Sequence, residues 1–262
     1  MPDKKNNNKD KLVLALDVET FEEAKKIVDE LHDLVGVFKV GKQLFTNVGP
    51  KIVEYINSKK AKVFLDLKYH DIPNTVQGAS KAAANLGVFM FNVHCAGGSE
   101  MMKAAIAGVK SANTGEKAAA NKNTASKNGR DPKEKSGKND VKVLGVTVLT
   151  SINENILHDE IHVNNILEDY VAHLALLAKN SGLHGVVASP KEIKLIREEC
   201  GKDFIILTPG VRPEWAAAGD QKRVMTPKEA IDAGADYIVV GRPILAAKDR
   251  KEAAKKILEE IE

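Results

Sequence analysis

Short apolar runs rich in β-branched residues alternate along this chain with longer stretches of helical periodicity. Such alternation is typical of repeated β-α units that build a parallel sheet. It predicts eight strands, at residues 12–16, 37–40, 62–67, 88–93, 143–149, 185–188, 204–207 and 237–240. Eight units in a chain of 262 residues favour the α/β fold of a TIM barrel, with a doubly wound open sheet as the weaker alternative.

The segments between these strands carry apolar stripes with the period of an α-helix. Thr20 and Glu23 form a capping-box pattern at the start of the first helix. Three predicted apolar faces are formed by Phe21, Ala24, Ile27, Val28 and Leu31, by Leu167, Val171, Leu174 and Ala178, and by Ala254, Ile257, Leu258 and Ile261. Each stripe predicts a helix that packs one face against the sheet.

The composition indicates one folded domain with two polar segments. An apolar content of 43% supports one large core, so we predict a single TIM-barrel domain over residues 12–262. Residues 1–11 are polar and rich in lysine and asparagine, and we expect a disordered extension there. Residues 111–140 contain no Leu, Ile, Val, Met or aromatic residue, which predicts a flexible low-complexity insertion. Its basic excess could instead contact an anionic partner.

Charge and hydropathy exclude two classes of partner. The 39 Lys and Arg residues nearly balance the 36 Asp and Glu residues, and nothing indicates a nucleic-acid-binding surface. The N-terminus lacks the apolar segment of a signal peptide, and no run approaches the roughly 18 apolar residues of a membrane span. We therefore expect a soluble cytoplasmic protein. Cys95 and Cys200 are far apart with no Cys-x-x-Cys pattern, so we interpret them as reduced, partly buried small side chains.

The third predicted strand ends in the most informative cluster of charges. Asp66 and Lys68 are two positions apart and therefore project from the same face of a strand, and Asp71 follows where the chain turns into a helix. In a TIM barrel the carboxyl ends of the strands carry the active site, so this placement predicts chemistry. An exposed salt bridge at a strand end is the structural alternative.

Other predicted strands also lead into polar residues. These are Asp17, Lys39, His94, Thr150 and Ser151, residues 209–212, and residues 241–243. The loops after the last two strands of such barrels commonly bind phosphate. Gly241 would allow close approach of the backbone, Arg242 can donate two hydrogen bonds to phosphate oxygens, and Pro243 suits the first position of a helix. Residues 209–225 form either a lid over the bound phosphate or only a long loop.

Seven motifs in this order resemble those of orotidine 5'-phosphate decarboxylases. They are LALD (14–17), FKVG (38–41), DLKYHDIPNT (66–75), NVH (92–94), LTS (149–151), TPGVR (208–212) and VGRP (240–243). The resemblance covers residues 12–109 and continues from 141 to the last helix. It implies a TIM-barrel homodimer that needs no cofactor and no metal, and that converts orotidine 5'-phosphate to uridine 5'-phosphate (UMP) with loss of carbon dioxide.

The resemblance also implies roles for the charged residues. Lys68 looks like the proton donor to C6 of the pyrimidine, and Asp66 would lie beside the carboxylate that leaves. Asp17 and Lys39 resemble the contacts to the ribose hydroxyls, with Lys39 also in the catalytic charged network. Asp71, together with Ile72 and Thr75, resembles the part that each subunit contributes to its neighbour's active site. The remaining implied substrate contacts are Thr150 or Ser151 to the base, and Pro209, Arg212, Gln221, Gly241 and Arg242 around the phosphate and its loop.

Several alternatives stay open at this point. Magnesium-dependent sugar-phosphate decarboxylases or aldolases of the same superfamily also carry Asp-x-Lys-x-x-Asp, but they use an acidic residue where this chain has Lys39, whose charge would repel the metal. A catalytically silent phosphate-binding protein is a second alternative, and it would lack part of the charged network. A scaffold protein that acts through the basic insertion is a still weaker alternative. His70 and His94 are interpreted as packing or supporting residues, and Trp215 either covers the site or packs.

Overall fold

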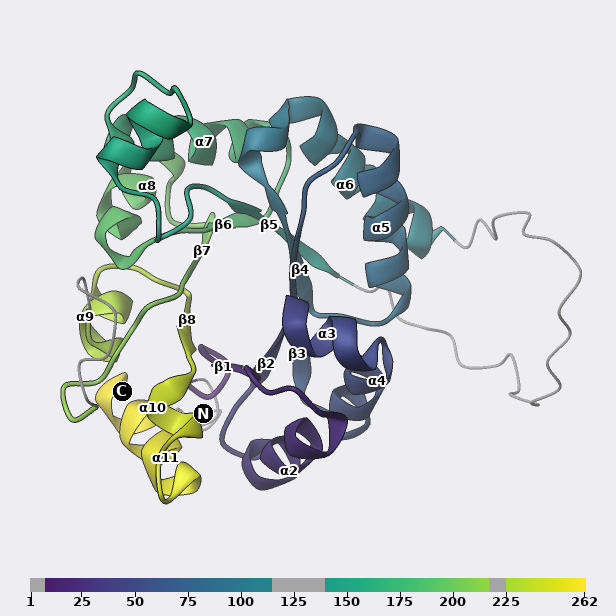
Figure 1. Cartoon of the computed structure of the whole chain (residues 1–262), viewed down its shortest axis with the longest axis vertical. Coiled ribbons are helices and arrows are strands. Elements are labelled where there is room, and N and C mark those ends of the chain that lie inside the picture. Colours follow the sequence, from purple (N-terminus) through teal and green to yellow (C-terminus); the bar gives the residue numbers. More distant parts are fainter. Residues whose placement is uncertain (1–7, 115–139, 217–224) are drawn as a thin grey trace, which may run out of the picture.

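Eight parallel strands form a closed barrel at the centre of the molecule (Figure 1). The computed structural model describes residues 8–114, 140–216 and 225–262. Pairing runs in chain order and closes between β1 and β8, where Val13 lies beside Val239. This closure confirms the predicted TIM barrel over the open sheet. The strands are β1 (Leu12–Ala15), β2 (Val37–Gly41), β3 (Lys62–Tyr69), β4 (Met90–His94), β5 (Lys142–Val146), β6 (Gly185–Val187), β7 (Ile205–Thr208) and β8 (Tyr237–Val240).

The strands are apolar on both faces because each face is buried against a different layer. Side chains such as Val13, Phe64 and Met90 point into the barrel and form its inner core. Their neighbours in sequence, such as Leu14 and Leu65, belong to the larger core between the strands and the surrounding helices. Double-sided burial explains why the strands appear in the sequence as continuous apolar runs.

Two predicted strand ends are wrong in an informative way. The fifth strand was expected to reach residue 149 but ends at Val146, and Val148 and Leu149 line a cavity instead. Their apolar character therefore serves the cavity and not the sheet. The third strand was expected to end at residue 67 but continues to Tyr69, with a register shift against β4.

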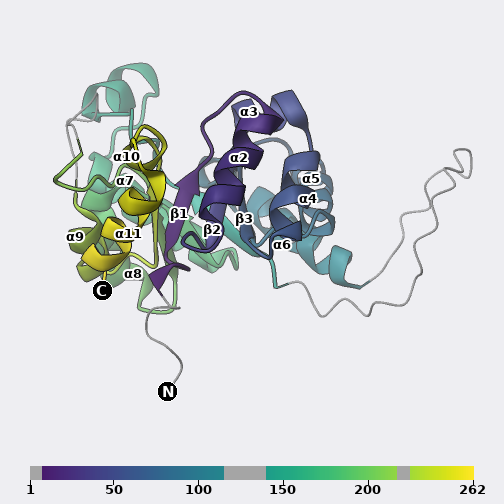
Figure 2. The same ribbon diagram turned by 90° about the horizontal axis from the view of Figure 1, so that it is seen from below.

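Helices surround the barrel and cover its outer face (Figure 1). They are α2 (Phe21–Leu31), α3 (Lys42–Val48), α4 (Lys51–Ser58), α5 (Pro73–Asn85), α6 (Gly98–Asn113), α7 (Leu167–Asn180), α8 (Ile193–Cys200), α9 (Pro227–Asp232), α10 (Arg242–Leu245) and α11 (Arg250–Glu260). Short turns of helix add η1 (Cys95–Gly97), η2 (Ile156–Glu160) and η3 (Pro190–Glu192). The side view places α3 and α10, which follow β2 and β8, toward the same end of the barrel (Figure 2).

The helix signals in the sequence are confirmed with one shift. Thr20 and Glu23 form the predicted capping box at the start of α2, and the predicted apolar stripes of α2, α7 and α11 supply buried residues. Pro243 was expected at the first helical position, but α10 begins one residue earlier at Arg242. Among the described segments, no helix is long and apolar enough to cross a bilayer.

Ordered structure extends into both segments that were expected to be disordered. Residues 8–11 were assigned to the extension, yet Lys9 accepts a hydrogen bond from Gly36 and Asp10 pairs with Lys62 at 2.9 Å. These contacts attach polar residues to the barrel without apolar burial, which a composition argument does not detect. The predicted insertion begins inside α6, because that helix continues to Asn113. Residues 1–7 and 115–139 lie outside the described part of the chain.

Candidate active site

A cavity of about 430 Å³ opens at the carboxyl end of the barrel. This size is within the range of roughly 300–1,000 Å³ that small-molecule sites occupy. Its lining combines an apolar floor with polar walls: Ala15, Asp17, Lys39, Phe64, Asp66, Lys68, Val146, Val148, Leu149, Thr150, Ser151, Val187, Ala188, Leu207, Pro209, Gly210, Val211, Arg212, Val239, Gly241, Arg242 and Pro243. The floor consists of the inner barrel core, which holds the polar groups on rigid strands.

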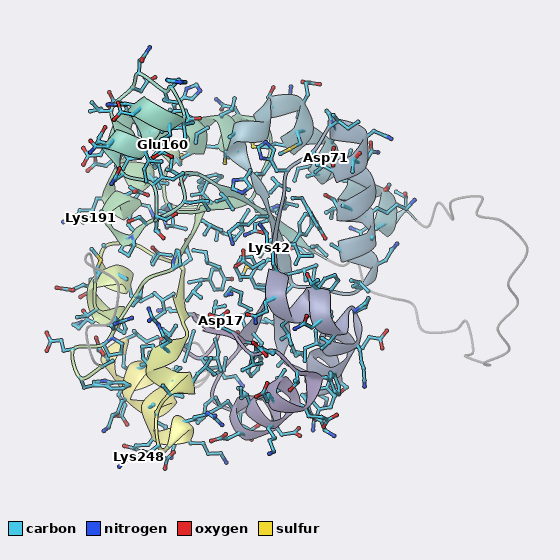
Figure 3. All side chains as sticks on the ribbon, in the orientation of Figure 1. Asp17, Lys42, Asp71, Glu160, Lys191 and Lys248 are labelled. Carbon is cyan, nitrogen blue, oxygen red and sulfur yellow. The ribbon has the colours of Figure 1, made fainter. Side chains whose placement is uncertain are left out.

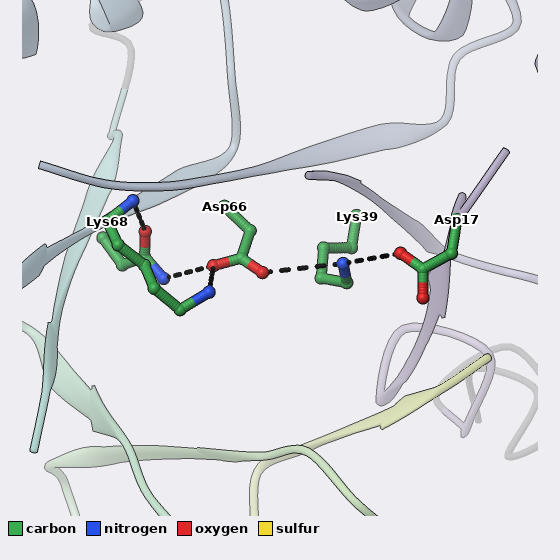
Figure 4. A network of polar contacts seen from close by, with 5 residues as sticks. Asp17, Lys39, Asp66 and Lys68 are labelled. Atoms are coloured by element: carbon green, nitrogen blue, oxygen red, sulfur yellow. Dashed lines mark hydrogen bonds and ion pairs between the residues drawn. The ribbon is translucent and has the colours of Figure 1, made fainter. Parts of the chain in front are cut away.

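Four charged side chains form a row along one wall of this cavity (Figure 4). Lys39 Nζ lies 3.1 Å from Asp17 Oδ1 and 3.5 Å from Asp66 Oδ2. Lys68 Nζ lies 2.6 Å from Asp66 Oδ1. Carboxylate and ammonium groups thus alternate from the residue after Leu16, past the end of β1, across β2 to β3, and the predicted meeting of Asp66 and Lys68 is confirmed.

Asp66 is the centre of this row and is held in its ionised form. Burial would raise its pKa, but the charges of Lys39 and Lys68 and the hydrogen bonds from Lys68 and Asn92 act in the opposite direction. The net effect lowers the pKa of Asp66 below its ordinary value. An ionised carboxylate therefore faces the cavity between two ammonium groups.

The backbone at Lys68 is unusual. Its φ of 53° lies in the left-handed region, which residues other than glycine rarely adopt. The Lys68 N–H donates to Asn92 Oδ1 at 2.8 Å, and Asn92 Nδ2 donates to Asp66 Oδ1 at 2.7 Å. Sequence reasoning assigned no role to Asn92. The signal that could have identified it is a polar residue at an inward-facing position of a buried strand, two residues after Met90.

Most of the predicted substrate contacts meet at the cavity. Asp17, Thr150, Ser151, Pro209, Arg212, Gly241 and Arg242 all line it together with the charged row. Gln221 lies outside the described residues. The loop that contains it has a fixed base, because Val211 and Met225 form a β-bridge and Arg212 N–H donates to Met225 at 3.0 Å.

Asp71, Ile72 and Thr75 do not join the cavity of their own chain. They are exposed at the start of α5, and Asp71 Oδ1 accepts the N–H of Ile72 at 2.6 Å. Figure 3 shows Asp71 over the helices at the outside of the barrel, whereas Asp17 lies at the central opening. The sequence grouped Asp71 with Asp66 and Lys68, but within one chain only the latter two are in contact. A role in a partner's site stays a prediction.

His70, which follows β3, and His94, the last residue of β4, lie side by side with ring centroids 5.3 Å apart. Burial and the positive charges nearby lower the pKa of His94 to about 4, so its ring is neutral at neutral pH. Within the described ranges, no group of three or more His, Cys, Asp or Glu side chains is arranged to hold a metal ion. Cys95 and Cys200 are free and almost fully buried, where only partial burial was expected, and burial raises the pKa of the Cys95 thiol to about 12.

Trp215 lies at the edge of the site. Its side chain is 46% exposed and borders a smaller cavity of about 370 Å³ together with Arg212 and Arg242. The residue therefore neither packs in the core nor covers the main cavity in this structure.

The family model for orotidine 5'-phosphate decarboxylase / HUMPS proteins matches residues 10–257. This match covers every strand of the barrel and every described residue that lines the cavity. The chain belongs to the orotidine 5'-phosphate decarboxylase / HUMPS family. Membership confirms the resemblance that the motifs indicated.

Individual members of the orotidine 5'-phosphate decarboxylase / HUMPS family match over almost their whole length. Orotidine 5'-phosphate decarboxylase of Geotalea daltonii is 50% identical over 251 residues, which are 96% of this chain and 95% of that one. The enzyme of the same name from Moorella thermoacetica is 48% identical over 254 residues, 97% of this chain and 93% of that one. The crystal structure of the Lactobacillus acidophilus decarboxylase superposes with a TM-score of 0.78 at 37% identity, covering 95% of this chain and 98% of that one.

Proposed function

We propose that this protein decarboxylates orotidine 5'-phosphate to UMP, the last step of de novo UMP synthesis. The observation that carries the proposal is the alternating row of Asp17, Lys39, Asp66 and Lys68 on one wall of a cavity of ligand size. The 50% identity to a decarboxylase of that name supports the choice of substrate.

The reaction needs a cation and a proton at one carbon atom. When the bond between C6 and the carboxylate breaks, carbon dioxide leaves and the electron pair stays on C6. It occupies an orbital from which the ring cannot delocalise the negative charge. An ammonium fixed next to C6 stabilises the developing negative charge and then transfers a proton to it. Lys68 is suited to both tasks, because its Nζ lines the cavity and is oriented by Asp66 at 2.6 Å.

The other charged groups divide into two functions in this proposal. Asp17 and Lys39 hold the ribose hydroxyls, and Asp66 lies beside the substrate carboxylate, where its ionised form would repel that group before it leaves. At the far side of the cavity Arg242 and Arg212 bind the phosphate, with Pro209 and Gly241 shaping the backbone around it. The resemblance adds Gln221 as a further phosphate contact. Binding energy from the phosphate would help to order the charged row.

A magnesium-dependent reaction on a sugar phosphate is the closest rival. It would need an acidic ligand at the end of β2, where this chain carries Lys39. Lys39 Nζ lies between the carboxylates of Asp17 and Asp66, and its positive charge would repel a divalent cation from that position. This arrangement favours the metal-free decarboxylation.

We further propose that the protein is a cytoplasmic homodimer in which each subunit completes its neighbour's site. Ile72 is 66% exposed and stands beside exposed Asp71 at the start of α5, as expected for residues that a second subunit covers. Mixing Asp71→Asn subunits with Lys68→Ala subunits tests the sharing. Random pairing would leave about a quarter of the sites intact. Demonstrably mixed dimers without recovered activity would contradict it.

The decisive experiment for the reaction follows pyrimidine ultraviolet absorbance when orotidine 5'-phosphate is added to protein treated with a chelator. The proposal predicts conversion to UMP at a rate that added magnesium does not increase. Turnover of a hexulose or keto-gulonate phosphate that depends on magnesium, with orotidine 5'-phosphate unchanged, would instead support the rival.

A further inference from the structure

We infer that Asn92 is a positioning residue that sets the conformation of Lys68 and the orientation of Asp66. The inference builds on the proposed decarboxylation for its kinetic readout. Neither the charged motif nor the family resemblance gives a cause for the irregular pairing of β3 with β4.

The sheet between β3 and β4 contains an irregularity directly at the catalytic motif. Leu65 pairs with Phe91 and Tyr69 pairs with Val93, so three residues of β3 lie opposite the single residue Asn92. Such a bulge removes regular backbone partners and redirects side chains. Here the Asn92 side chain takes the place of a backbone acceptor, because its Oδ1 receives the Lys68 N–H at 2.8 Å.

This hydrogen bond supports a backbone conformation that lysine rarely adopts by itself. The φ of Lys68 is 53°, and such strained residues persist only where their surroundings hold them. An extended backbone at this position would direct the side chain elsewhere. The left-handed conformation therefore contributes to bringing Lys68 Nζ to Asp66 Oδ1 at 2.6 Å.

The second half of the amide fixes the carboxylate. Asn92 Nδ2 donates to Asp66 Oδ1 at 2.7 Å, the same oxygen that Lys68 contacts, while Asp66 Oδ2 faces Lys39 at 3.5 Å. The orientation of the amide follows from its partners, because a backbone N–H requires an acceptor and an ionised carboxylate requires a donor. Only an uncharged side chain of this shape with one acceptor and one donor satisfies both.

Asn92 acts through its neighbours and not on the substrate. Its side chain is 0% exposed and is not among the described residues that line the cavity. Loss of Asn92 should therefore reduce turnover far more than binding, because the ligand contacts remain while Lys68 and Asp66 lose their orientation.

The test compares Asn92→Asp, Asn92→Ala and the control Thr147→Val. Aspartate keeps the shape and an acceptor for Lys68, but it replaces the donor by a second carboxylate oxygen facing Asp66. Thr147 is also a buried polar residue on the barrel, and its hydroxyl donates to Val187 at 3.3 Å without contact to the charged row. For each protein, kcat, KM, the affinity for UMP and the melting temperature are measured.

We expect Asn92→Ala to lower kcat by about 100-fold, the scale of a misplacement of about 1 Å, while KM and UMP affinity change by less than about threefold. Asn92→Asp should show a similar loss at about pH 8 that shrinks several-fold toward about pH 6, because a protonated carboxyl again donates to Asp66. The charged groups of the row are Asp66, Lys68 and Lys39, and His94 with His70 and Lys42 lies next to them. His94 with its pKa of about 4 does not titrate in this range, and the loss is taken relative to wild type at each pH, so that titration of groups shared by both proteins cancels. Thr147→Val should keep kcat within about twofold, since it leaves the row untouched.

Two results would overturn the inference: a folded Asn92→Ala protein with wild-type kcat, or an Asn92→Asp deficit that does not change with pH. A crystal structure of Asn92→Ala gives a readout that is independent of activity, in which Lys68 should leave the left-handed region. If wild-type protein does not decarboxylate orotidine 5'-phosphate, the proposed function fails, and the Lys68 conformation in that crystal structure still decides the positioning role.

Discussion

Charged clusters lie at both ends of the barrel and are built in opposite ways. At the amino end Arg197 of α8 is the centre. Its guanidinium donates to the backbone oxygens of Gly201, Lys202, Phe204 and Gly234 and to the carboxylate of Asp236. Asp236 in turn accepts the N–H of Ile206 at 2.8 Å. Arginine and aspartate there connect the starts of β7 and β8 to α8.

At the carboxyl end the ammonium of Lys68 pairs with Asp66 and also faces a cavity. Its backbone is strained, and the nearby Lys39 holds two carboxylates of which Asp17 is 62% exposed. The difference shows how a barrel separates stability from chemistry. The amino end directs its charges to the protein's own backbone, whereas the carboxyl end keeps charged groups oriented but available to a ligand.

The largest expected effect is at the carboxyl end. Lys68→Ala should lower kcat by about 10,000-fold, because it removes both the cation and the proton donor. The melting temperature should change little, since the Lys68 ammonium pairs with a single carboxylate in the described structure and Asp66 keeps its contacts with Lys39 and Asn92. Substantial activity in a folded Lys68→Ala protein would exclude the proton-donor role.

The end of the same cavity that is proposed to bind phosphate should show a smaller loss. Arg242→Ala should reduce kcat/KM by about 100-fold, with kcat affected as well as KM, because phosphate binding helps to order the reacting groups. Lys248→Ala is the matched control, since Lys248 is exposed beyond α10 and does not line the cavity. Unchanged catalytic efficiency in Arg242→Ala would refute the assignment of the phosphate site.

The amino-end cluster should respond in stability and not in rate. Arg197→Met removes the guanidinium that donates to several backbone oxygens and to Asp236, so the free energy of unfolding should fall by about 2–3 kcal/mol while kcat of the folded protein stays the same. Arg250→Met removes a more exposed arginine, 35% against 20% for Arg197, that contacts Glu30 and one backbone oxygen, and it should cost less than about 1 kcal/mol. Denaturant unfolding of both variants measures the difference. A drop in kcat for Arg197→Met at full folding would argue against the separation.

The smallest effect concerns pH. Burial lowers the pKa of His94 from 6.5 to about 4, so the folded protein favours the neutral ring. That contribution to stability is complete above about pH 6.5 and is lost as the pH falls toward about 4. His94→Gln should therefore flatten the decline of the melting temperature over this interval, with His184, whose pKa burial also lowers, accounting for part of the remaining slope. An unchanged slope would show that His94 does not contribute.

The sequence predicted those parts of the fold and site that follow from periodicity. Apolar runs predicted the eight strands because both faces of each strand are buried. The period of two predicted that Asp66 and Lys68 meet, and they do, but through the left-handed backbone of Lys68 and not through regular strand alternation. Val148 and Leu149 were assigned to a strand although they line the cavity, because apolar character alone does not distinguish these two environments.

Features that depend on irregular backbone could not be predicted in this way. The bulge opposite Asn92 and the left-handed Lys68 have no periodic signal. Asp71 is three residues after Lys68 in the sequence, yet in one chain it lies outside the cavity, since the helix start turns it away from the barrel opening.

A crystal structure with UMP bound tests the central claim most directly. The account predicts that Lys68 Nζ lies within about 3.5 Å of C6 of the pyrimidine, still paired with Asp66. A structure in which Lys68 Nζ points away from the pyrimidine into solvent would contradict it.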